Sequence, residues 1–284
     1  MRASFSRKTK SGHEPQQKSL PEDAGTGRPT VIVLALLSLV VVGATLFAHW
    51  PVLSAQAMSF DDEEAIIENR LVQHPSWNSV GRFFREVTLS SVVRGYYRPL
   101  TLTSLMLDWA MGGRPEDFRP FHRTSLALHL GSTVLVILLC YQVFRQPIIA
   151  ALVGLLFGVH PLTVEPIAWV MERKTILAAF FAFACLNAYV GYTRGPRWGW
   201  YAAAVVLYLL SLLAKPTGTP LPIVMLLMDY WPLKRFSRRA VLEKIPFFIL
   251  SAVFAALCVL CEQEVNPLWL PAKLSPLHLP LRLC

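Results

Sequence analysis

Long runs of apolar residues, separated by short polar connections, dominate the pattern of this chain. The first run covers residues 31–49 and contains no acid, lysine or arginine, and about 20 apolar residues are enough to cross the hydrocarbon core of a bilayer. Further runs follow a mixed stretch, and we expect a helix in each of them. They cover residues 123–144, 147–160, 168–192, 198–214, 217–231 and 243–262. The pattern therefore predicts an all-α, polytopic transmembrane helical bundle with about seven spans.

The remaining segments divide the chain into three parts. Residues 1–30 are polar and rich in Ser, Gly, Pro, Lys and Arg, which is typical of a disordered cytoplasmic tail. Residues 31–262 form the expected transmembrane domain, and within it residues 50–122 form a mixed first loop. Its segment 99–111 is amphipathic and is expected to lie in the membrane interface. Residues 263–284 are expected to be a divergent or truncated C-terminal tail.

Composition excludes a soluble globular domain. The chain has 54% hydrophobic and 16% charged residues, and its mean hydropathy is +0.45. The net charge of +9 would suggest a nucleic-acid partner in a soluble protein, but here the positive residues lie between the apolar runs, so we expect no nucleic acid. Every second connection is basic, which predicts a cytoplasmic N-terminus and an extracytoplasmic first loop. These connections contain Arg145, Arg194, Arg197, Lys234, Arg235, Arg238 and Arg239.

An acidic run follows the first apolar segment, at Asp61, Asp62, Glu63 and Glu64. Adjacent carboxylates repel one another, so one of them is expected to have a raised pKa or to hold a cation unless the whole run is solvated. The simpler reading is a helix start, with Asp61 as the N-cap and Glu64 in the capping-box position.

Other polar residues fall on the same, extracytoplasmic side of the predicted bundle. They are Arg98, His122, His160, Glu165, Arg173, Lys174 and Lys215. Ionisable residues at membrane depth usually face a cavity or pair with an opposite charge. Cations at that depth would suit a lipid-linked phosphate, while a carboxylate would accept a proton from an incoming hydroxyl.

Each of these residues also has a simpler interpretation. Arg98 could extend to lipid headgroups, and Lys215 could anchor a span at the interface. His160 could merely end a span before Pro161. Glu165 and Arg173 could form a structural ion pair. These alternatives stay open at the level of sequence.

Several blocks in a fixed order resemble a known family. The chain is similar to the membrane half of the transmembrane O-mannosyltransferases that modify cadherins, and to their bacterial relatives with tetratricopeptide repeats. These enzymes belong to the GT-C class of glycosyltransferases. The resemblance covers about residues 30–262 and rests on the blocks FDDEEAIIEN, YYRPLTLTSLMLD, FRPFHRTSLALH, LLFGVHPLTVEPIAWVMERKTILAA, LLAKPTG and MLLMDYWPLKR.

The resemblance implies roles for particular residues. Asp61 or Asp62 would be the catalytic base, with Asp61 favoured because it follows Phe60. The substrate-binding residues would be Arg98, His160, Glu165, Arg173 and Lys215. A divalent metal at Asp62 and Glu63 is an open alternative. The chain departs from the family pattern at Ser125, Lys174 and Pro216.

The implied activity is transfer of a hexose, similar to mannose, from a polyprenyl-phosphate sugar to a Ser or Thr hydroxyl of a protein acceptor on the extracytoplasmic face. The expected location is a bacterial inner membrane rather than the endoplasmic reticulum. The alternative is a catalytically inactive, truncated membrane protein or an envelope assembly partner. A transporter is a third class, but the two halves show no inverted repeat.

Overall fold

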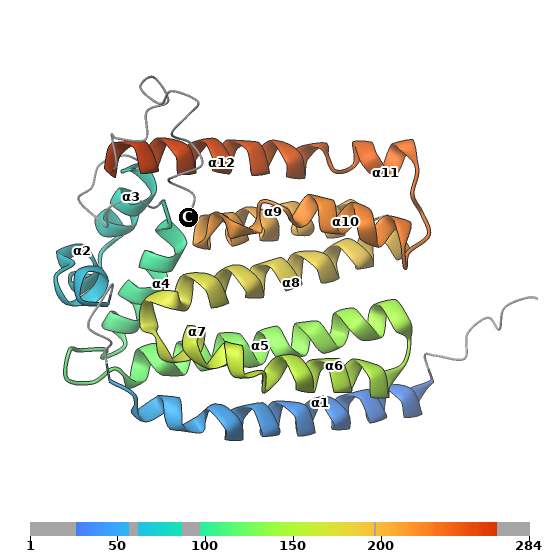
Figure 1. Ribbon diagram of the computed structural model, residues 1–284, viewed down its shortest axis with the longest axis horizontal. Helices are drawn as coiled ribbons and strands as arrows, with labels where there is room; N and C mark the ends of the chain where they lie inside the picture. The colour runs from blue at the N-terminus through green and yellow to red at the C-terminus, as the bar shows by residue number, and fades with distance from the viewer. Residues whose placement is uncertain (1–26, 57–61, 87–96, 196, 266–284) are drawn as a thin grey trace, which may run out of the picture.

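The long helices of the protein run side by side (Figure 1). The computed structural model describes residues 27–56, 62–86, 97–195 and 197–265, and these residues form helices and no β-strand. In Figure 1, α1 lies at the bottom of the stack and α12 at the top. The bundle helices are α1 (Arg28–His49), α5 (Arg119–Phe144), α6 (Pro147–Gly158), α8 (Arg173–Arg194), α9 (Trp198–Ala214), α10 (Leu221–Tyr230) and α12 (Ile245–Val265).

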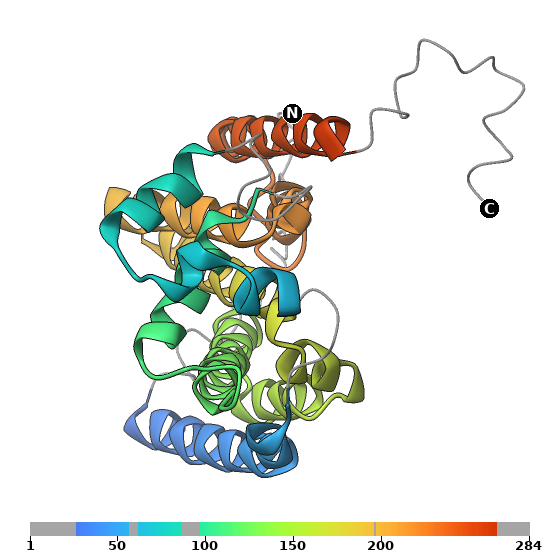
Figure 2. The same ribbon diagram turned by 90° about the vertical axis from the view of Figure 1, so that its left-hand side faces the viewer.

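Short helices gather at one end of the bundle, which we call the α4 end. Figure 2 faces this end and shows the chain of α2 to α4 lying across the ends of the long helices. The opposite end, the α11 end, carries α11 (Arg238–Leu242). The short elements elsewhere are η1 (Trp50–Ser54), η2 (Glu63–Ile67), α2 (Arg70–Gln73), α3 (Trp77–Arg85), α4 (Pro99–Ala110), η3 (Pro161–Thr163), α7 (Val164–Ala168), η4 (Val170–Glu172) and η5 (Pro216–Gly218).

The number of membrane spans is smaller than the expected seven. Within the described residues, four helical stretches are long and apolar enough to cross a bilayer: Pro29–Ser54, Arg119–Phe144, Val170–Arg194 and Arg238–Cys261. A fifth span is possible only if α6 and the segment Pro161–Ala168, which bend by 54° at their junction, count as one.

The prediction of seven was wrong because the runs 198–214 and 217–231 form helices that are too short, and the run 147–160 forms the 12-residue α6, which is long enough only together with the bent segment after it. The run 217–231 becomes η5 and the 10-residue α10, and α9 has 17 residues. A helix rises about 1.5 Å per residue, so α10 covers only about half of a hydrocarbon core. Multi-pass membrane helices are nevertheless what the chain contains.

Glycines bring the helices of the lower half into close contact. A Cβ atom on Gly154 of α6 would lie 2.2 Å from Cγ1 of Ile137 in α5. A Cβ atom on Gly158 would lie 2.3 Å from Oγ1 of Thr45 in α1. Small residues of this kind let membrane helices approach closely enough to gain dispersion energy. The α6 helix is therefore fixed between α1 and α5.

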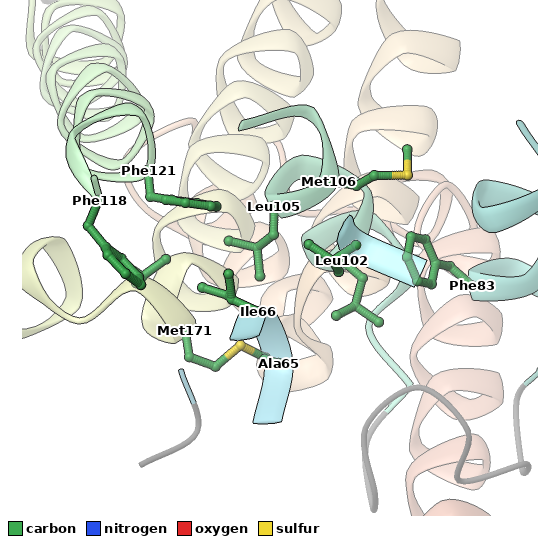
Figure 3. Packing of buried hydrophobic residues seen from close by; sticks show 11 residues of the cluster. Ala65, Ile66, Phe83, Leu102, Leu105, Met106, Phe118, Phe121 and Met171 are labelled. Atoms are coloured by element: carbon green, nitrogen blue, oxygen red, sulfur yellow. The ribbon is translucent and has the colours of Figure 1, made fainter. Parts of the chain in front are cut away.

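A compact apolar core holds the α4 end together (Figure 3). Leu102, Leu105 and Met106 of α4, the helix that the sequence predicts as an interfacial segment, are buried. They pack in one cluster with Ile66 of η2 and with Met171, which precedes α8. The first loop thus forms a folded cap on the bundle, because its apolar residues are packed against the starts of α5 and α8.

A buried ionic network holds α12 at the opposite end. Lys244, directly before α12, pairs with Asp229 of α10, and both side chains are 0% exposed. Tyr189 of α8 donates a hydrogen bond of 2.5 Å from its hydroxyl to Asp229 Oδ1. Arg235, in the connection after α10, pairs with Glu243. The network therefore joins α8, α10, the start of α12 and the connection between α10 and α12. Breaking such a pair leaves an uncompensated buried charge, which makes it a firm link between elements.

Candidate functional site

Most of the residues predicted for the site lie at helix termini near the α4 end. Asp62 precedes η2, Arg98 precedes α4, and Arg173 begins α8. His160 precedes η3, Glu165 lies in the first turn of α7, and Lys215 follows α9. Asp61 lies outside the described residues. The fold brings Asp62, Arg98, Arg173 and Lys215 to the α4 end, whereas His160 follows α6, which ends beside the middle of α5. The contacts of these residues divide them into separate groups.

The first group is a buried ion pair between α8 and α4. Arg173 Nη2 lies 2.7 Å from Asp108 Oδ2, and the two side chains are 0% and 1% exposed. Arg173 Nε donates to Ser125 Oγ at 2.9 Å, and Nη1 donates to Ser104 Oγ at 3.0 Å. Nη2 also donates to the carbonyl oxygen of Phe121. The guanidinium is bound on all sides by protein oxygens from α4 and α5.

The ionisation of Asp108 depends on this pair. Burial raises the pKa of its carboxyl, while Arg173 and the hydroxyl of Thr124, which donates to Oδ1 at 2.6 Å, act in the opposite direction. Asp108 lies within the YYRPLTLTSLMLD block, but no role is predicted for it from the sequence alone. An acid in an apolar helix was the available signal, because such a residue needs a charged partner.

The second group places two lysines around one glutamate. Glu172 Oε1 lies 2.8 Å from Lys174 Nζ, and Glu172 Oε2 lies 3.5 Å from Lys215 Nζ. Lys215 Nζ also donates to Thr175 Oγ1 at 2.8 Å, and the Thr175 hydroxyl in turn donates to Glu172. The side chains of Lys174, Glu172 and Lys215 are 12%, 17% and 28% exposed. With two positive charges and one negative charge, this partly open group is suited to bind an anion.

Asp62 has a clear structural contact. Its side chain is buried, and Oδ1 accepts a hydrogen bond of 2.8 Å from the backbone N–H of Met171. This bond connects the acidic run to the turn that leads into α8. Arg98 is also buried, at 5% exposure. Both residues therefore face the protein interior at the α4 end.

His160 and Glu165 lie on the surface of the connection between α6 and α8. His160 Nδ1 accepts a hydrogen bond of 3.2 Å from the backbone N–H of Leu162, which caps η3. Both side chains are exposed. His122, in contrast, is buried in α5 with Nε2 at 3.1 Å from the carbonyl oxygen of Ala55. The structure does not pair Glu165 with Arg173, which binds Asp108 instead.

A metal centre finds no support in the described residues. Nowhere among them do three or more His, Cys, Asp or Glu side chains come close enough to hold an ion. Glu63 is exposed, whereas Asp62 next to it is buried and bonded to Met171.

The chain is similar to curated protein O-mannosyl-transferases. It is 26% identical over 192 residues to Protein O-mannosyl-transferase tmtc2 of Xenopus laevis, covering 65% of this chain and 23% of that protein. Identity with TMTC3 of Homo sapiens is 28% over 190 residues, covering 63% and 20%. Identity with Tmtc2 of Drosophila melanogaster is 30% over 184 residues, covering 60% and 19%.

These matches confirm the resemblance as distant homology to the TMTC protein O-mannosyl-transferases. The matched part of the chain spans only about a fifth to a quarter of the length of these three relatives. No family model and no solved structure matches the chain.

Proposed function

We propose that this chain carries the membrane part of a glycosyltransferase, which moves mannose from a polyprenyl-phosphate donor to a Ser or Thr hydroxyl of a protein. The distant homology with protein O-mannosyl-transferases is the observation that carries the proposal. The lysine group at the α4 end adds chemical support, because the leaving group of this reaction is a lipid phosphate that needs electrostatic stabilisation.

In this proposal Lys174 and Lys215 hold the donor phosphate. Their ammonium groups both contact Glu172, so they lie close to one oxyanion already. A phosphate oxygen in the same place would gain charge-assisted hydrogen bonds. Their partial exposure leaves a path for the headgroup of a lipid that arrives from the membrane.

Arg173 is proposed to position these lysines rather than to bind substrate. In the part of the chain that the structure describes, its guanidinium contacts protein oxygens, and its side chain is fully buried. It fixes the first turn of α8 against α4 and α5, and the next residue along this turn is Lys174. The same buried pair therefore sets where the neighbouring ammonium group emerges.

Asp61 is proposed as the general base that takes the proton of the acceptor hydroxyl. The adjacent Asp62 is buried and accepts a hydrogen bond from the Met171 amide, which precedes α8. Exposed His160 and Glu165 would contact the acceptor chain, and Arg98 would support the same end of the bundle. We further propose that this end faces away from the cytoplasm of a bacterial cell, because the basic connections belong to the α11 end.

The test is mannose transfer from mannosyl-phosphate polyprenol to a Ser/Thr peptide by the purified full chain. Asp61→Asn should lower turnover by roughly 100-fold or more, because general bases contribute at least this much. Asp62→Asn keeps an acceptor oxygen for Met171 and should lose less activity. Asp62→Ala removes that oxygen and should lower the midpoint temperature of unfolding.

Glu64→Gln is the matched control, since this exposed carboxylate lies in the same acidic run. It should keep the activity of the unmodified chain. Equal turnover in Asp61→Asn and the unmodified chain would disprove the base assignment. A folded chain that binds the donor and transfers nothing would instead favour an inactive membrane protein.

A further inference from the structure

A groove lies on the outside of the bundle between α5 and α8. Its volume is about 630 Å³, and Arg123, Thr124, Ala127, Leu128 and Phe180 line it together with Met111 after α4. Both α5 and the stretch that includes α8 are long and apolar enough to cross a membrane. The wall of Ala127, Leu128 and Phe180 is therefore suited to hydrocarbon, and pockets between membrane helices are common lipid sites.

Arg123 supplies a positive charge to this groove. Its side chain is exposed and lies within electrostatic range of Asp117, but among the residues that the structure describes it forms no ion pair. Arg119, one turn earlier on α5, is different because its Nε lies 2.8 Å from Asp117 Oδ1. Of these two arginines, only Arg123 lines the groove. An arginine beside an apolar wall matches a ligand with a hydrocarbon chain and an anionic head.

The space in the groove depends on Gly131. Phe180 of α8 leans over this glycine, so that a Cβ atom there would lie 2.9 Å from Phe180 Cε2. A side chain at position 131 would push the ring away from α5. Phe180 also lines the groove. Because Gly131 has no side chain, the Phe180 ring can lie against α5, and this position of the ring sets the width of the groove.

We propose that this groove binds one acyl chain of an anionic membrane phospholipid, whose phosphate contacts Arg123. The proposed donor phosphate has its own cations, Lys174 and Lys215, on other segments. The lipid in the groove is thus a second ligand beyond the proposed reaction. Thr124, in the wall of the groove, donates its hydroxyl to Asp108, so the bound lipid would lie directly behind the buried ion pair.

The test is native mass spectrometry of the purified full chain with phosphatidylglycerol or phosphatidylcholine. The unmodified protein should retain one phosphatidylglycerol in preference to phosphatidylcholine. Arg123→Gln should lower that retention about tenfold or more, because charge-assisted hydrogen bonds to phosphate are strong. Arg119→Gln is the control and should leave retention unchanged, since Arg119 is already paired with Asp117.

The groove itself is tested with phosphatidylglycerol that carries a photoactivatable acyl chain. Gly131→Ala should reduce crosslinking to Phe180 and Leu128, whereas Gly43→Ala, which has no atom within 4 Å of the added Cβ, should not. If Gly131→Ala does not fold, Arg123→Gln still decides the question. Equal retention of the two lipids, unchanged retention in Arg123→Gln, or displacement by an equimolar polyprenyl phosphate would overturn the proposal.

Discussion

Arg173 and Asp108 form the buried charge pair on which the α4 end depends. Two serines and a backbone carbonyl complete the shell around the guanidinium, so no donor group of this arginine has to face hydrocarbon. A buried pair is expensive to form, but it is more expensive to break, because the remaining charge then has no partner. The pair is therefore a link between α4 and α8.

The first prediction at this scale concerns Arg173→Met. This change should lower the free energy of unfolding by about 3–5 kcal/mol at neutral pH. The exposed pair of Arg119 and Asp117 provides the control, and Asp117→Asn should cost about 1 kcal/mol or less. Unfolding in detergent, followed by circular dichroism, measures both. Equal losses in the two variants would contradict the burial argument.

The pH dependence of the same variant follows from Asp108. Without Arg173, burial is opposed only by the hydrogen bond from Thr124, and the pKa of this carboxyl in the folded state is raised further above the unfolded value. The folded state then binds the proton more tightly. Stability should be greatest below the ordinary pKa of an aspartate and should be lost as the pH rises through the folded pKa.

At the level of residues, the sequence pointed to ionisable positions near the helix ends but not to their partners. Arg173 and Lys215 were predicted to share one site, and both lie at the α4 end. Asp108 is 65 positions away from Arg173 in the chain, so no local spacing could indicate the pair. The departure at Ser125 is now explained in part, because its hydroxyl accepts a bond from Arg173.

Among the elements, α6 shows how a membrane helix ends inside the protein. The last carbonyl groups of a helix need partners from outside it. The carbonyl oxygen of Gly158 lies 2.9 Å from Nε2 of His49 and 2.9 Å from Nε2 of His129. Helices α1 and α5 thus supply the two histidines that complete the end of α6 before the 54° bend.

Gly158→Ala tests this arrangement. The added Cβ atom would lie 2.3 Å from Thr45 Oγ1, so the Thr45 hydroxyl must give up its hydrogen bond to Val41 or α1 and α6 must separate. Overpacking of this kind costs about 1–3 kcal/mol, and the unfolding midpoint should fall accordingly. Gly43→Ala on α1, where the new methyl group meets no atom within 4 Å, should leave it unchanged or slightly higher. An unfolding midpoint equal to that of Gly43→Ala would show that α1 and α6 accommodate the added methyl group without loss of stability.

The apolar pattern predicted the existence of helices better than their lengths. The runs 31–49 and 123–144 correspond to α1 and α5. The run 217–231 does not form one span, because the short helix η5 covers Pro216–Gly218 and α10 begins only after Pro220. A hydropathy average depends only on side-chain type, so it does not detect a break in the backbone of a helix.

Across the whole molecule, both ends combine apolar packing with buried charges. The α4 end has its apolar core and the pair of Arg173 and Asp108. At the α11 end, the ionic network around Asp229 and Lys244 lies beside an apolar cluster that includes Tyr189, Tyr192 and Phe247. Through this network, α10 and the connection between α10 and α12 bind the start of α12. The motif MLLMDYWPLKR contains Asp229 and Arg235, but its spacing alone could not reveal a partner on the following helix.

Lys244→Met should loosen α12 along its whole length. We expect a lower unfolding midpoint, and faster thiol labelling of Cys261, which is only 4% exposed at the far end of this helix. The labelling uses a background with Cys140, Cys185, Cys258 and Cys284 changed to Ser. Lys234→Met, at an exposed lysine, is the control. Unchanged labelling in Lys244→Met would mean that the apolar contacts of α12 suffice.

Glu172 holds Lys174 and Lys215 together before any ligand binds. Two ammonium groups repel each other, and bringing them together normally requires work when a ligand arrives. Here a resident carboxylate, 2.8 Å from one and 3.5 Å from the other, has already assembled them. An incoming lipid phosphate would only have to replace this internal anion, and when the phosphate leaves, the glutamate can return and keep the two ammonium groups together for the next one.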